Sequence, residues 1–424
     1  MSRALDQIVI SAMGVAAPLG HTPESLFDAL VRKESGLAEI GGFDPDVFPT
    51  RVGGLVKDFA AKEWVKNRKN LKLMTDAVRL GMAGVKRAYD ASGLEEGELD
   101  PDRFGIFVGA GTAVGKTEDL LPAISAASGG AGFDAAEFGE VGMHRINPLW
   151  LLKGLSNNVL GFSTADLDAR GINQNYCNSG VGGLQAVGEA AWAIAEDRAD
   201  FILAGGADCS ANPLHMTGFG RLEALTSRST PDAVRPFDAS HDGFAPGQGA
   251  AFFSLETEDR ARAGGRQPIA RIAGYANACA GHAMGTGDPE VVADSIQRVL
   301  KMAAWSLDEV DLFYAHGNGT VKYDSIEAEA LRTVFGDKQP PVTSNKGNLG
   351  HSVAASGPLS MVCALMSMRR GLIPPVLFFE RLAPECHGID LVHTHARDGA
   401  PKRCLVQAAG IGGQTTIIAL ESVD

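Results

Sequence analysis

Short apolar runs rich in β-branched and aromatic residues alternate along this chain with longer segments rich in alanine. Buried strands are predicted at FGIFVGAG (104–111), DFILAGGAD (200–208), DLFYAHG (311–317) and RCLVQAAG (403–410). Helices are predicted over 71–94 and 183–199. This alternation predicts an α/β protein with buried, largely parallel strands. Because several runs end in glycine, functional residues are expected at the carboxyl ends of strands.

The first apolar run, residues 8–20, has the hydrophobicity of a signal peptide but not its pattern. Asp6 precedes it, and Gly14, Pro18 and Gly20 interrupt it, so a buried first strand that enters a glycine turn is predicted instead. Elsewhere no stretch is long and apolar enough to span a membrane.

Two segments far apart in the chain resemble each other. Ser179-Gly180 and Ser356-Gly357 each open a helix of small residues. This repetition hints at two related halves whose helices face each other across a pseudo-twofold axis. The polar stretch 256–265 is the predicted boundary. The halves are therefore taken as 1–256, with the candidate nucleophile, and 257–424, with two candidate histidines.

Composition narrows the class of protein. A chain of 424 residues favours two domains or two halves over one small core. The net charge of -13 argues against nucleic acid as the main partner. Six widely spread cysteines form no CxxC pair, so neither a disulfide framework nor a zinc site is indicated. A reducing cytoplasm is the expected location.

Cys177 is the first candidate for chemistry. It follows a predicted strand and precedes a predicted helix, where backbone N–H groups and the helix dipole favour a thiolate. Free cysteines are more often buried structural residues. From position alone, a nucleophile and a structural cysteine are equally good interpretations.

Two histidines occupy similar junctions. His316 lies in YAHGNGT, and His351 lies in SNKGNLGHSVAASG five residues after Lys346. Each histidine alone would be interpreted as structural. Together with Cys177 they suit acyl chemistry, because a thiolate can hold a thioester while two neutral imidazoles donate to a developing oxyanion or enolate.

These motifs carry a resemblance that spans nearly the whole chain. NYCNSG, AHGNGTVKYDSIEAEAL and SNKGNLGHSVAASG occur in the order found in the elongating β-ketoacyl synthases of type II fatty acid and polyketide assembly. RPFDASHDGFAPGQGAAFFSLE and AAGIGGQTTIIALE match two further segments of that family. The resemblance implies a thiolase-like fold, with two pseudo-related halves in a five-layered α-β-α-β-α core.

The resemblance also implies a mechanism. Cys177 would take an acyl group from the phosphopantetheine arm of an acyl carrier protein, with no other cofactor and no metal. His316 and His351 would stabilise the enolate left by decarboxylation of a malonyl-type extender. The N–H groups of Cys177 and Ile411 would form the oxyanion hole. Thr320 would line the pantetheine path, and Lys346 would tune the site electrostatically.

Several matched positions depart from the family's usual residues, which implies a changed pocket, extender or partner and favours specialised metabolism. Ile411 replaces the usual gating phenylalanine, and Ser360 replaces an acidic partner of the lysine. In the segment 235–256, His241 and Gln248 replace an arginine and an acidic residue. Other substitutions are Tyr176, Asn178 and Asn318, and these three residues together with Ser360 and Thr320 are the predicted substrate contacts.

A basic run, residues 62–72, stands out in this acidic chain. Such runs are usually solvated helix faces. In the family an acidic carrier protein docks on a basic patch at the matching place, so a docking surface is predicted at Lys66, Arg68, Lys69, Lys72, Arg221 and Arg228.

Two other functions remain open at this point. Asn318 and Ser360 would also fit an acyltransferase on the same fold that does not decarboxylate. A subunit that sets chain length beside an active ketosynthase is the non-catalytic alternative. A homodimer and a heterodimer with a second ketosynthase-like subunit are both compatible with the sequence.

Overall fold

The fold is built on one large mixed sheet. The computed structural model describes residues 5–95, 97–111, 115–129, 132–282 and 284–423. Within them, the sheet has the spatial strand order β14-β12-β11-β16-β17-β10-β1-β9-β8-β4-β7. Its strands are β1 (Ile8–Ala16), β4 (Phe104–Ala110), β7 (Asn173–Tyr176), β8 (Phe201–Cys209), β9 (Gln248–Thr257), β10 (Ala270–Cys279), β11 (Leu312–Tyr314), β12 (Pro341–Thr343), β14 (Asp390–Leu391), β16 (Arg403–Ala409) and β17 (Gln414–Ser422).

Smaller strand pairs and the helices complete the fold. The pairs are β2 (Leu37–Glu39) with β3 (Val52–Gly54), β5 (Ser128–Gly129) with β6 (Gly132–Phe133), and β13 (Leu372–Ile373) with β15 (Arg397–Asp398). The helices are α1 (Pro23–Val31), α2 (Asp76–Ala91), α3 (Thr117–Ala126), α4 (Ala135–Glu137), α5 (Trp150–Lys153), α6 (Asn158–Leu167), α7 (Gly182–Ala195), α8 (Pro213–Arg221), α9 (Glu258–Ala263), α10 (Pro289–Ala303), α11 (Val321–Phe335), α12 (Lys346–Leu349) and α13 (Ser356–Arg370).

The sheet repeats one arrangement twice. In β7-β4-β8-β9-β1 the strands appear in the chain order third, second, fourth, fifth, first, and β12-β11-β16-β17-β10 has the same order. β1 and β10 join the two sets by antiparallel pairing, with Val9 opposite Arg271. The position of the boundary between the halves stays a prediction.

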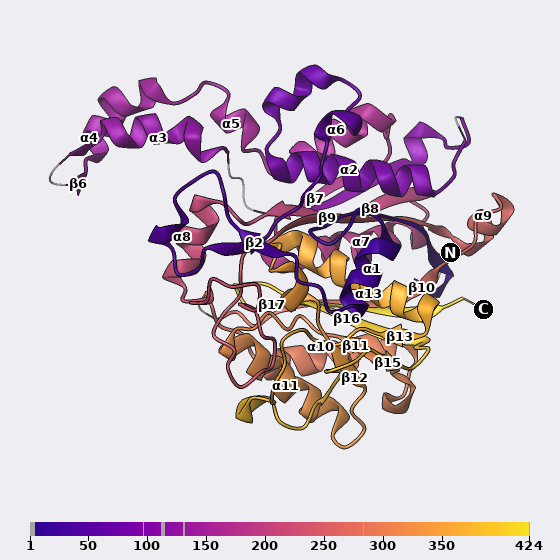
Figure 1. Cartoon of the computed structure of the whole chain (residues 1–424). Coiled ribbons are helices and arrows are strands. Elements are labelled where there is room, and N and C mark those ends of the chain that lie inside the picture. Colours follow the sequence, from indigo (N-terminus) through magenta and orange to yellow (C-terminus); the bar gives the residue numbers. More distant parts are fainter. Residues whose placement is uncertain (1–4, 96, 112–114, 130–131, 283, 424) are drawn as a thin grey trace.

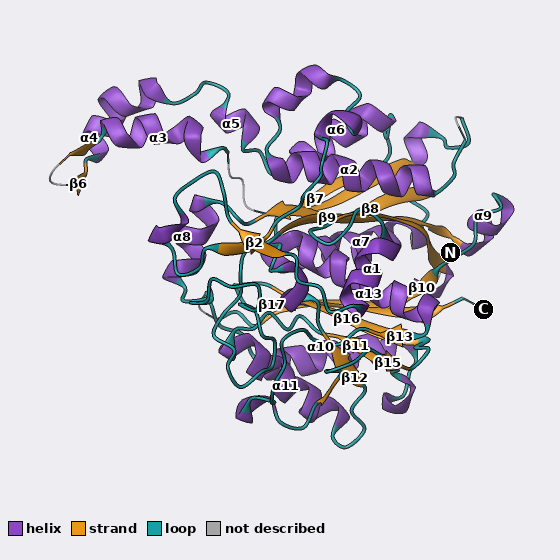
Figure 2. Ribbon diagram, in the orientation of Figure 1, coloured by secondary structure: helices purple, strands orange, loops and turns teal. Residues whose placement is uncertain are grey.

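Helices cover both faces of each set of strands (Figures 1 and 2). α2 and α6 lie outside the first set, and α10 and α11 lie outside the second. α7 and α13 pack against each other between the two sets, so the predicted five-layered, thiolase-like fold is confirmed. Their contact is close because Gly183 on α7 has no side chain: a Cβ there would lie 2.5 Å from the Cγ atom of Pro358 on α13.

The predicted strands at 104–111, 200–208, 311–317 and 403–410 are confirmed as β4, β8, β11 and β16. The prediction of a largely parallel sheet is wrong. β4, β7 and β8 pair in parallel, as do β11, β12, β14 and β16, but β9 runs antiparallel to β1 and β8, and β17 to β10 and β16. A tight turn after Ala409 returns the chain as β17, which only an antiparallel pair permits.

The predicted helix over 71–94 starts later than expected. α2 begins at Asp76, and residues Arg68–Leu73 form a 3-10 helix instead. Between them Met74 is extended, with φ -101° and ψ 127°, and its side chain is buried. The extended backbone at the buried Met74 therefore separates the 3-10 helix, which carries the basic residues, from α2.

One segment projects from the body of the molecule. Residues 117–155, called here the arm, carry α3, α4 and α5 and extend away from the sheet in Figure 1. Its described part exposes the apolar side chains of Leu121, Phe133, Met143, Leu149, Leu151, Leu152 and Leu155. In the described chain no helix has both the length and the apolar character needed to cross a membrane.

Candidate active site

His316 lies just beyond the carboxyl end of β11, on a turn that is bound by a side chain of α11. The backbone N–H groups of His316 and Gly317 donate to the two oxygens of the Glu327 carboxylate, at 2.7 and 2.8 Å. Glu327 is on the second turn of α11 and is buried. This contact sets the place of the His316 backbone.

The imidazole of His316 is buried and neutral. Its Nδ1 accepts the Ala409 N–H at 3.2 Å, which puts the ring proton on Nε2. Burial lowers the pKa of His316 well below its usual value, and the neighbouring His351 and Lys346 lower it further. The ring therefore presents an Nε2–H donor throughout the neutral pH range.

His351 reaches the same state by a different contact. Its Nδ1 lies 2.9 Å from Ser356 Oγ, and that oxygen accepts the Ser352 N–H at 2.9 Å. The Ser356 hydroxyl can therefore donate to Nδ1, which leaves the ring proton on Nε2. Burial first, and then the charge of Lys346, lowers the pKa of His351 to about 3.

The two imidazoles face each other in one pocket. Their ring centroids are 5.2 Å apart and their planes are perpendicular. The pocket has a volume of about 280 Å³. Of the residues singled out by sequence, it is lined by His316, His351, Asn318, Thr320 and Ile411. Two neutral N–H donors in a small, partly enclosed cavity suit the stabilisation of a developing negative charge on oxygen.

The walls of this pocket carry both polar and apolar side chains. Asn318 Oδ1 accepts the N–H and the hydroxyl of Thr320, at 3.0 and 2.7 Å. Among the apolar lining residues, Phe244 packs edge-on against His351, with centroids 4.8 Å apart, and Ile411 packs against the cluster around Phe244.

Lys346 lies beneath the histidines, fully buried. Its Nζ is 3.3 Å from Ser360 Oγ and 3.4 Å from Asn345 Oδ1, and no carboxylate of the described residues lies within salt-bridge distance. Burial lowers its pKa to about 8, although the charge of Glu327 acts in the opposite direction. Burial likewise raises the pKa of Glu327 to about 7.

Cys177 follows β7 on the edge of the sheet and is not among the residues that line the histidine pocket. Its side chain is exposed, and its Sγ accepts the Asn175 amide at 3.2 Å. The turn that follows it packs on both histidine-bearing regions. A Cβ on Gly180 would lie 2.2 Å from the Ala409 carbonyl oxygen, and residues Ser179–Val181 contact Val353–Ala355.

The side chains of the two residues beside Cys177 bind residues outside the histidine pocket. Tyr176 donates to Gln174 and packs against the ring of Phe107, with centroids 6.0 Å apart. The Asn178 amide donates to Gln185 Oε1 at 3.0 Å. Neither side chain lines the histidine pocket.

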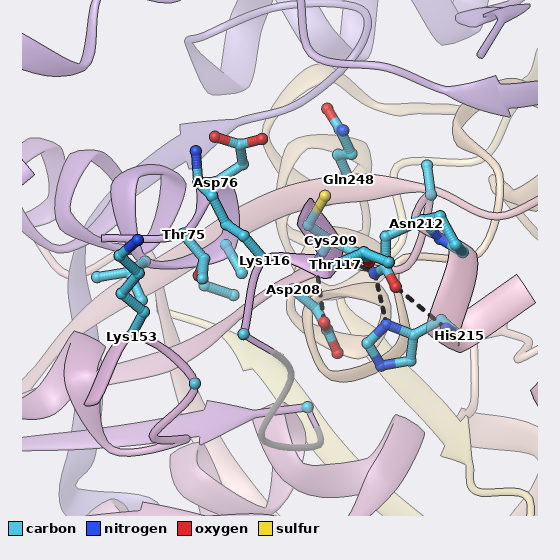
Figure 3. Close-up of a pocket in the computed structure, with 18 of the residues that line it drawn as sticks. Thr75, Asp76, Lys116, Thr117, Lys153, Asp208, Cys209, Asn212, His215 and Gln248 are labelled. Carbon is cyan, nitrogen blue, oxygen red and sulfur yellow. Dashed lines mark hydrogen bonds between the residues drawn. The ribbon is translucent and has the colours of Figure 1, made fainter. Parts of the chain in front are cut away.

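A second hollow, of about 250 Å³, lies at the carboxyl ends of β4 and β8 (Figure 3). It contains Cys209, His215 and Asp208, a combination that could suggest a cysteine hydrolase. In Figure 3 the sulfur of Cys209 points toward Gln248, away from the His215 ring. Burial, together with the charges of Asp76 and Asp208, raises the pKa of Cys209 to about 12, so this thiol is not a nucleophile at neutral pH.

The predicted basic contacts divide into two groups. Lys66, Arg68, Lys69, Lys72 and Arg221 are exposed. Arg228 is half-buried, and its Nη2 donates to the Ser240 carbonyl at 2.8 Å.

Sequence reasoning missed several residues of this site. Glu327 and Ser356 orient the two histidines, and Lys322 and Tyr323 line the pocket. Glu327 had a signal, since it stands one helical turn after Asp324 on the face that must meet the strand end. No metal-ligating group of three or more His, Cys, Asp or Glu side chains occurs among the described residues.

Comparison with known proteins covers nearly the whole chain. Residues 5–261 match the family model of the β-ketoacyl synthase N-terminal domain, and residues 269–380 match that of the C-terminal domain. The chain is 30% identical over 423 residues to 3-oxoacyl-[acyl-carrier-protein] synthase 2 of Coxiella burnetii, covering 98% of this chain and 99% of that protein. It is 29% identical over 430 residues to actinorhodin polyketide putative β-ketoacyl synthase 1 of Streptomyces coelicolor, covering 99% and 89%.

Solved structures agree. The ishigamide ketosynthase/chain length factor matches with a TM-score of 0.87 and 25% identity, over 98% of this chain and 99% of that chain. A β-ketoacyl synthase from Burkholderia phymatum matches with a TM-score of 0.86 and 24% identity, over 99% and 100%.

Proposed function

The chain belongs to the β-ketoacyl synthase family, and from this we propose that it condenses an acyl group held on Cys177 with a malonyl-type extender. The observation that carries this proposal is the pair of buried, neutral imidazoles that present two N–H donors to one small pocket. The order of the sequence motifs, together with the exposed Cys177 at the end of β7, supports the same reaction.

The first half-reaction is acyl transfer. The Cys177 thiolate attacks the thioester carbonyl of an acyl group on a phosphopantetheine arm, and the carbon–sulfur bond to the arm breaks. The arm leaves as a thiol after taking a proton, and the acyl group remains on Cys177 as a new thioester. The N–H groups of Cys177 and Ile411 stabilise the oxyanion of the tetrahedral intermediate.

The second half-reaction forms the carbon–carbon bond. The bond between the malonyl α-carbon and its carboxylate breaks, carbon dioxide leaves, and the electron pair is delocalised onto the thioester oxygen. His316 and His351 donate their Nε2–H groups to that enolate oxygen. The α-carbon then attacks the acyl carbonyl on Cys177, and the thiolate departs to leave a β-ketoacyl thioester on the carrier arm.

The test separates the two half-reactions. Incubation with an acyl carrier is expected to increase the mass of the Cys177 peptide in the wild type and in Cys279→Ala, which removes a second exposed cysteine, but not in Cys177→Ala. His316→Ala and His351→Ala should still acylate Cys177 but lose release of carbon dioxide. Condensation by Cys177→Ala would refute the proposal. Acylation without release of carbon dioxide by the wild type would instead indicate a non-decarboxylating acyltransferase.

An acidic acyl carrier protein is the proposed partner. The exposed side chains of Lys66, Arg68, Lys69 and Lys72 provide opposite charge on an otherwise acidic chain, and opposite charge steers association. We expect Lys69→Glu to raise the KM for a carrier-bound acyl group, with Lys301→Glu on α10 as the control. An unchanged KM in Lys69→Glu would exclude this docking surface.

We propose that a second ketosynthase-like chain, identical or different, packs against the arm in a dimer. The described part of the arm exposes seven large apolar side chains, which is typical of an interface surface and not of a free one. The proposed dimer buries them. Light scattering on the purified chain alone distinguishes a homodimer from a chain that awaits a different subunit.

A further inference from the structure

His241 is buried between two carboxylates. Its Nδ1 lies 3.0 Å from Asp324 Oδ2, and its Nε2 lies 3.1 Å from Glu385 Oε1. An ionised carboxylate only accepts hydrogen bonds, so each ring nitrogen must carry a proton for both contacts to form. The geometry therefore fits the doubly protonated imidazolium.

Asp324 connects this histidine to the active site. Its Oδ1 accepts the Gly319 N–H at 3.1 Å, and its Oδ2 accepts the Phe237 N–H at 2.7 Å. Gly319 stands between Asn318 and Thr320, which line the histidine pocket. Its φ of 84° lies in the left-handed region, which glycine adopts readily.

The same turn is held from its other side by the loop that carries His241. The Gly243 N–H donates to the Gly319 carbonyl at 2.8 Å, and the His241 N–H donates to the Asp238 carbonyl at 2.9 Å. Hydrogen bonds from residue 243 and from Asp324 thus reach Gly319 from opposite directions. A change at His241 therefore affects both hydrogen bonds to Gly319: the one to Asp324, which His241 contacts directly, and the one from Gly243, which lies on the same loop as His241.

We propose that His241 is a positioning residue for the condensation: its imidazolium pairs with the buried Asp324 carboxylate and fixes its place, and Asp324 in turn holds the turn that carries Asn318 and Thr320 into the pocket. This inference rests on the proposed function for its catalytic consequence. The contact itself is independent of that function, because it can be observed in the resting protein.

Other charged groups lie around this contact. The charge of Asp324 reaches Glu327 on α11 and Lys346 on α12, and it raises the pKa of each. Near Glu385 the neighbouring groups are His387 and Arg332. On the His241 loop itself, Asp242 binds Thr226 and Ser227, and Arg228 binds the Ser240 carbonyl.

The arrangement makes the turn sensitive to alkaline pH. Burial works against the charge of His241, but the hydrogen bonds and charges of Asp324 and Glu385 outweigh it and raise the pKa of His241 above that of a free histidine. The stabilisation is therefore complete below the ordinary histidine pKa and is lost as the pH rises through the higher value in the folded protein.

The first experiment observes the contact directly. Nitrogen-15 NMR of the histidine rings in the wild type is expected to show both His241 nitrogens protonated at pH 7, with assignment by comparison with His241→Gln. A neutral His241 ring at pH 7 would overturn the proposal whether or not the protein is a ketosynthase.

The second experiment measures the consequence. His241→Gln is expected to slow release of carbon dioxide from a malonyl carrier by about tenfold or more, the effect of losing one hydrogen bond to a charged group, while mass spectrometry still finds Cys177 acylated. His241→Arg, which keeps a cation at every pH, should restore decarboxylation relative to His241→Gln and weaken the alkaline loss. His395→Gln, on an exposed loop, is the control.

The outcomes are distinguishable. Equal decarboxylation by His241→Gln and wild type would refute the positioning role. If His241→Arg lost as much activity as His241→Gln while melting at the wild-type temperature, charge would not be what His241 supplies. A wild type that releases no carbon dioxide would refute the proposed function and leave the NMR result to decide the state of His241.

Discussion

Replacing Lys346 by methionine is expected to stabilise the folded protein while slowing decarboxylation. The Lys346 ammonium is fully buried, and its contacts are the neutral oxygens of Asn345 and Ser360, at 3.4 and 3.3 Å. Burial of a charge without a carboxylate partner is unfavourable. The charge is nevertheless close enough to His316 and His351 to lower the pKa of both, and in the proposed mechanism it favours the enolate that these histidines bind.

The magnitude follows from the pKa. The pKa of Lys346 falls from 10.5 to about 8, and each pKa unit corresponds to roughly 1.4 kcal/mol, so the buried charge costs about 3 kcal/mol at pH 7. Methionine removes this cost and has a similar length. Ser360 Oγ still donates to Asn345 Oδ1 at 3.2 Å, so the substitution leaves these two groups paired. K346M should therefore gain roughly 1–3 kcal/mol in free energy of unfolding at pH 7.

The sign of the pH dependence provides the sharper test. The folded pKa lies below the unfolded one, so between pH 8 and pH 10.5 the unfolded chain binds more protons, and wild-type stability rises with pH in that window. The advantage of K346M should accordingly shrink by about half at pH 9.5. Urea unfolding at matched protein concentration measures it, with Lys301→Met, exposed on α10, expected within ~0.5 kcal/mol of wild type.

Three results would each refute a part of this reasoning. A K346M protein less stable than wild type at pH 7 would mean that the ammonium has favourable partners. An advantage that stays constant up to pH 9.5 would mean that the charge of Lys346 is not its origin. Faster decarboxylation by K346M would show that the charge does not assist the reaction.

Three further predictions test the remaining parts of the site. Gly180→Ala places a Cβ 2.2 Å from the Ala409 carbonyl oxygen, so it should lower the free energy of unfolding by ~1–3 kcal/mol and slow acyl transfer; wild-type stability by urea unfolding would show that the turn can yield. Because the pKa of His351 is about 3 and that of His316 is also lowered, decarboxylation should show no histidine midpoint between pH 7 and pH 5. The two rings should lower stability below pH 6.5, because they take up protons only in the unfolded chain; an activity midpoint near 6.5 would contradict this. Leu151 is 70% exposed on the arm and should be needed for dimerisation, so light scattering should show that Leu151→Asp is a monomer. Decarboxylation and the folding of the monomer are measured in parallel. An unchanged dimer would mean that the arm is not part of the interface.

Local pattern explains why the elements could be predicted. The runs at β4, β8 and β16 are short, apolar and bounded by glycine, and such runs are buried whatever surrounds them. Strand direction could not be obtained in this way. A parallel and an antiparallel strand can have the same apolar pattern, and the direction of β17 depends on the turn that precedes it.

The same distinction applies to the candidate site. Motif order placed His316 and His351 together with Ile411, and the folded chain brings all three to one pocket. The protonation of each ring depends on the Ala409 N–H and on Ser356, which belong to other segments. No local pattern could have predicted these partners, because hydrogen bonds between loops depend on how the loops are brought together.

The sequence by itself determined the residues that are able to do chemistry: a cysteine at a strand–helix junction, two histidines and a lysine at glycine-framed turns. Only the tertiary structure decided their states. Burial makes both imidazoles neutral donors, leaves Lys346 charged without a carboxylate, and leaves Cys177 exposed on the edge strand. The reason is physical. A residue's identity limits which protons it can hold, but the pKa of each group depends on the desolvation and the charges that packing places around it.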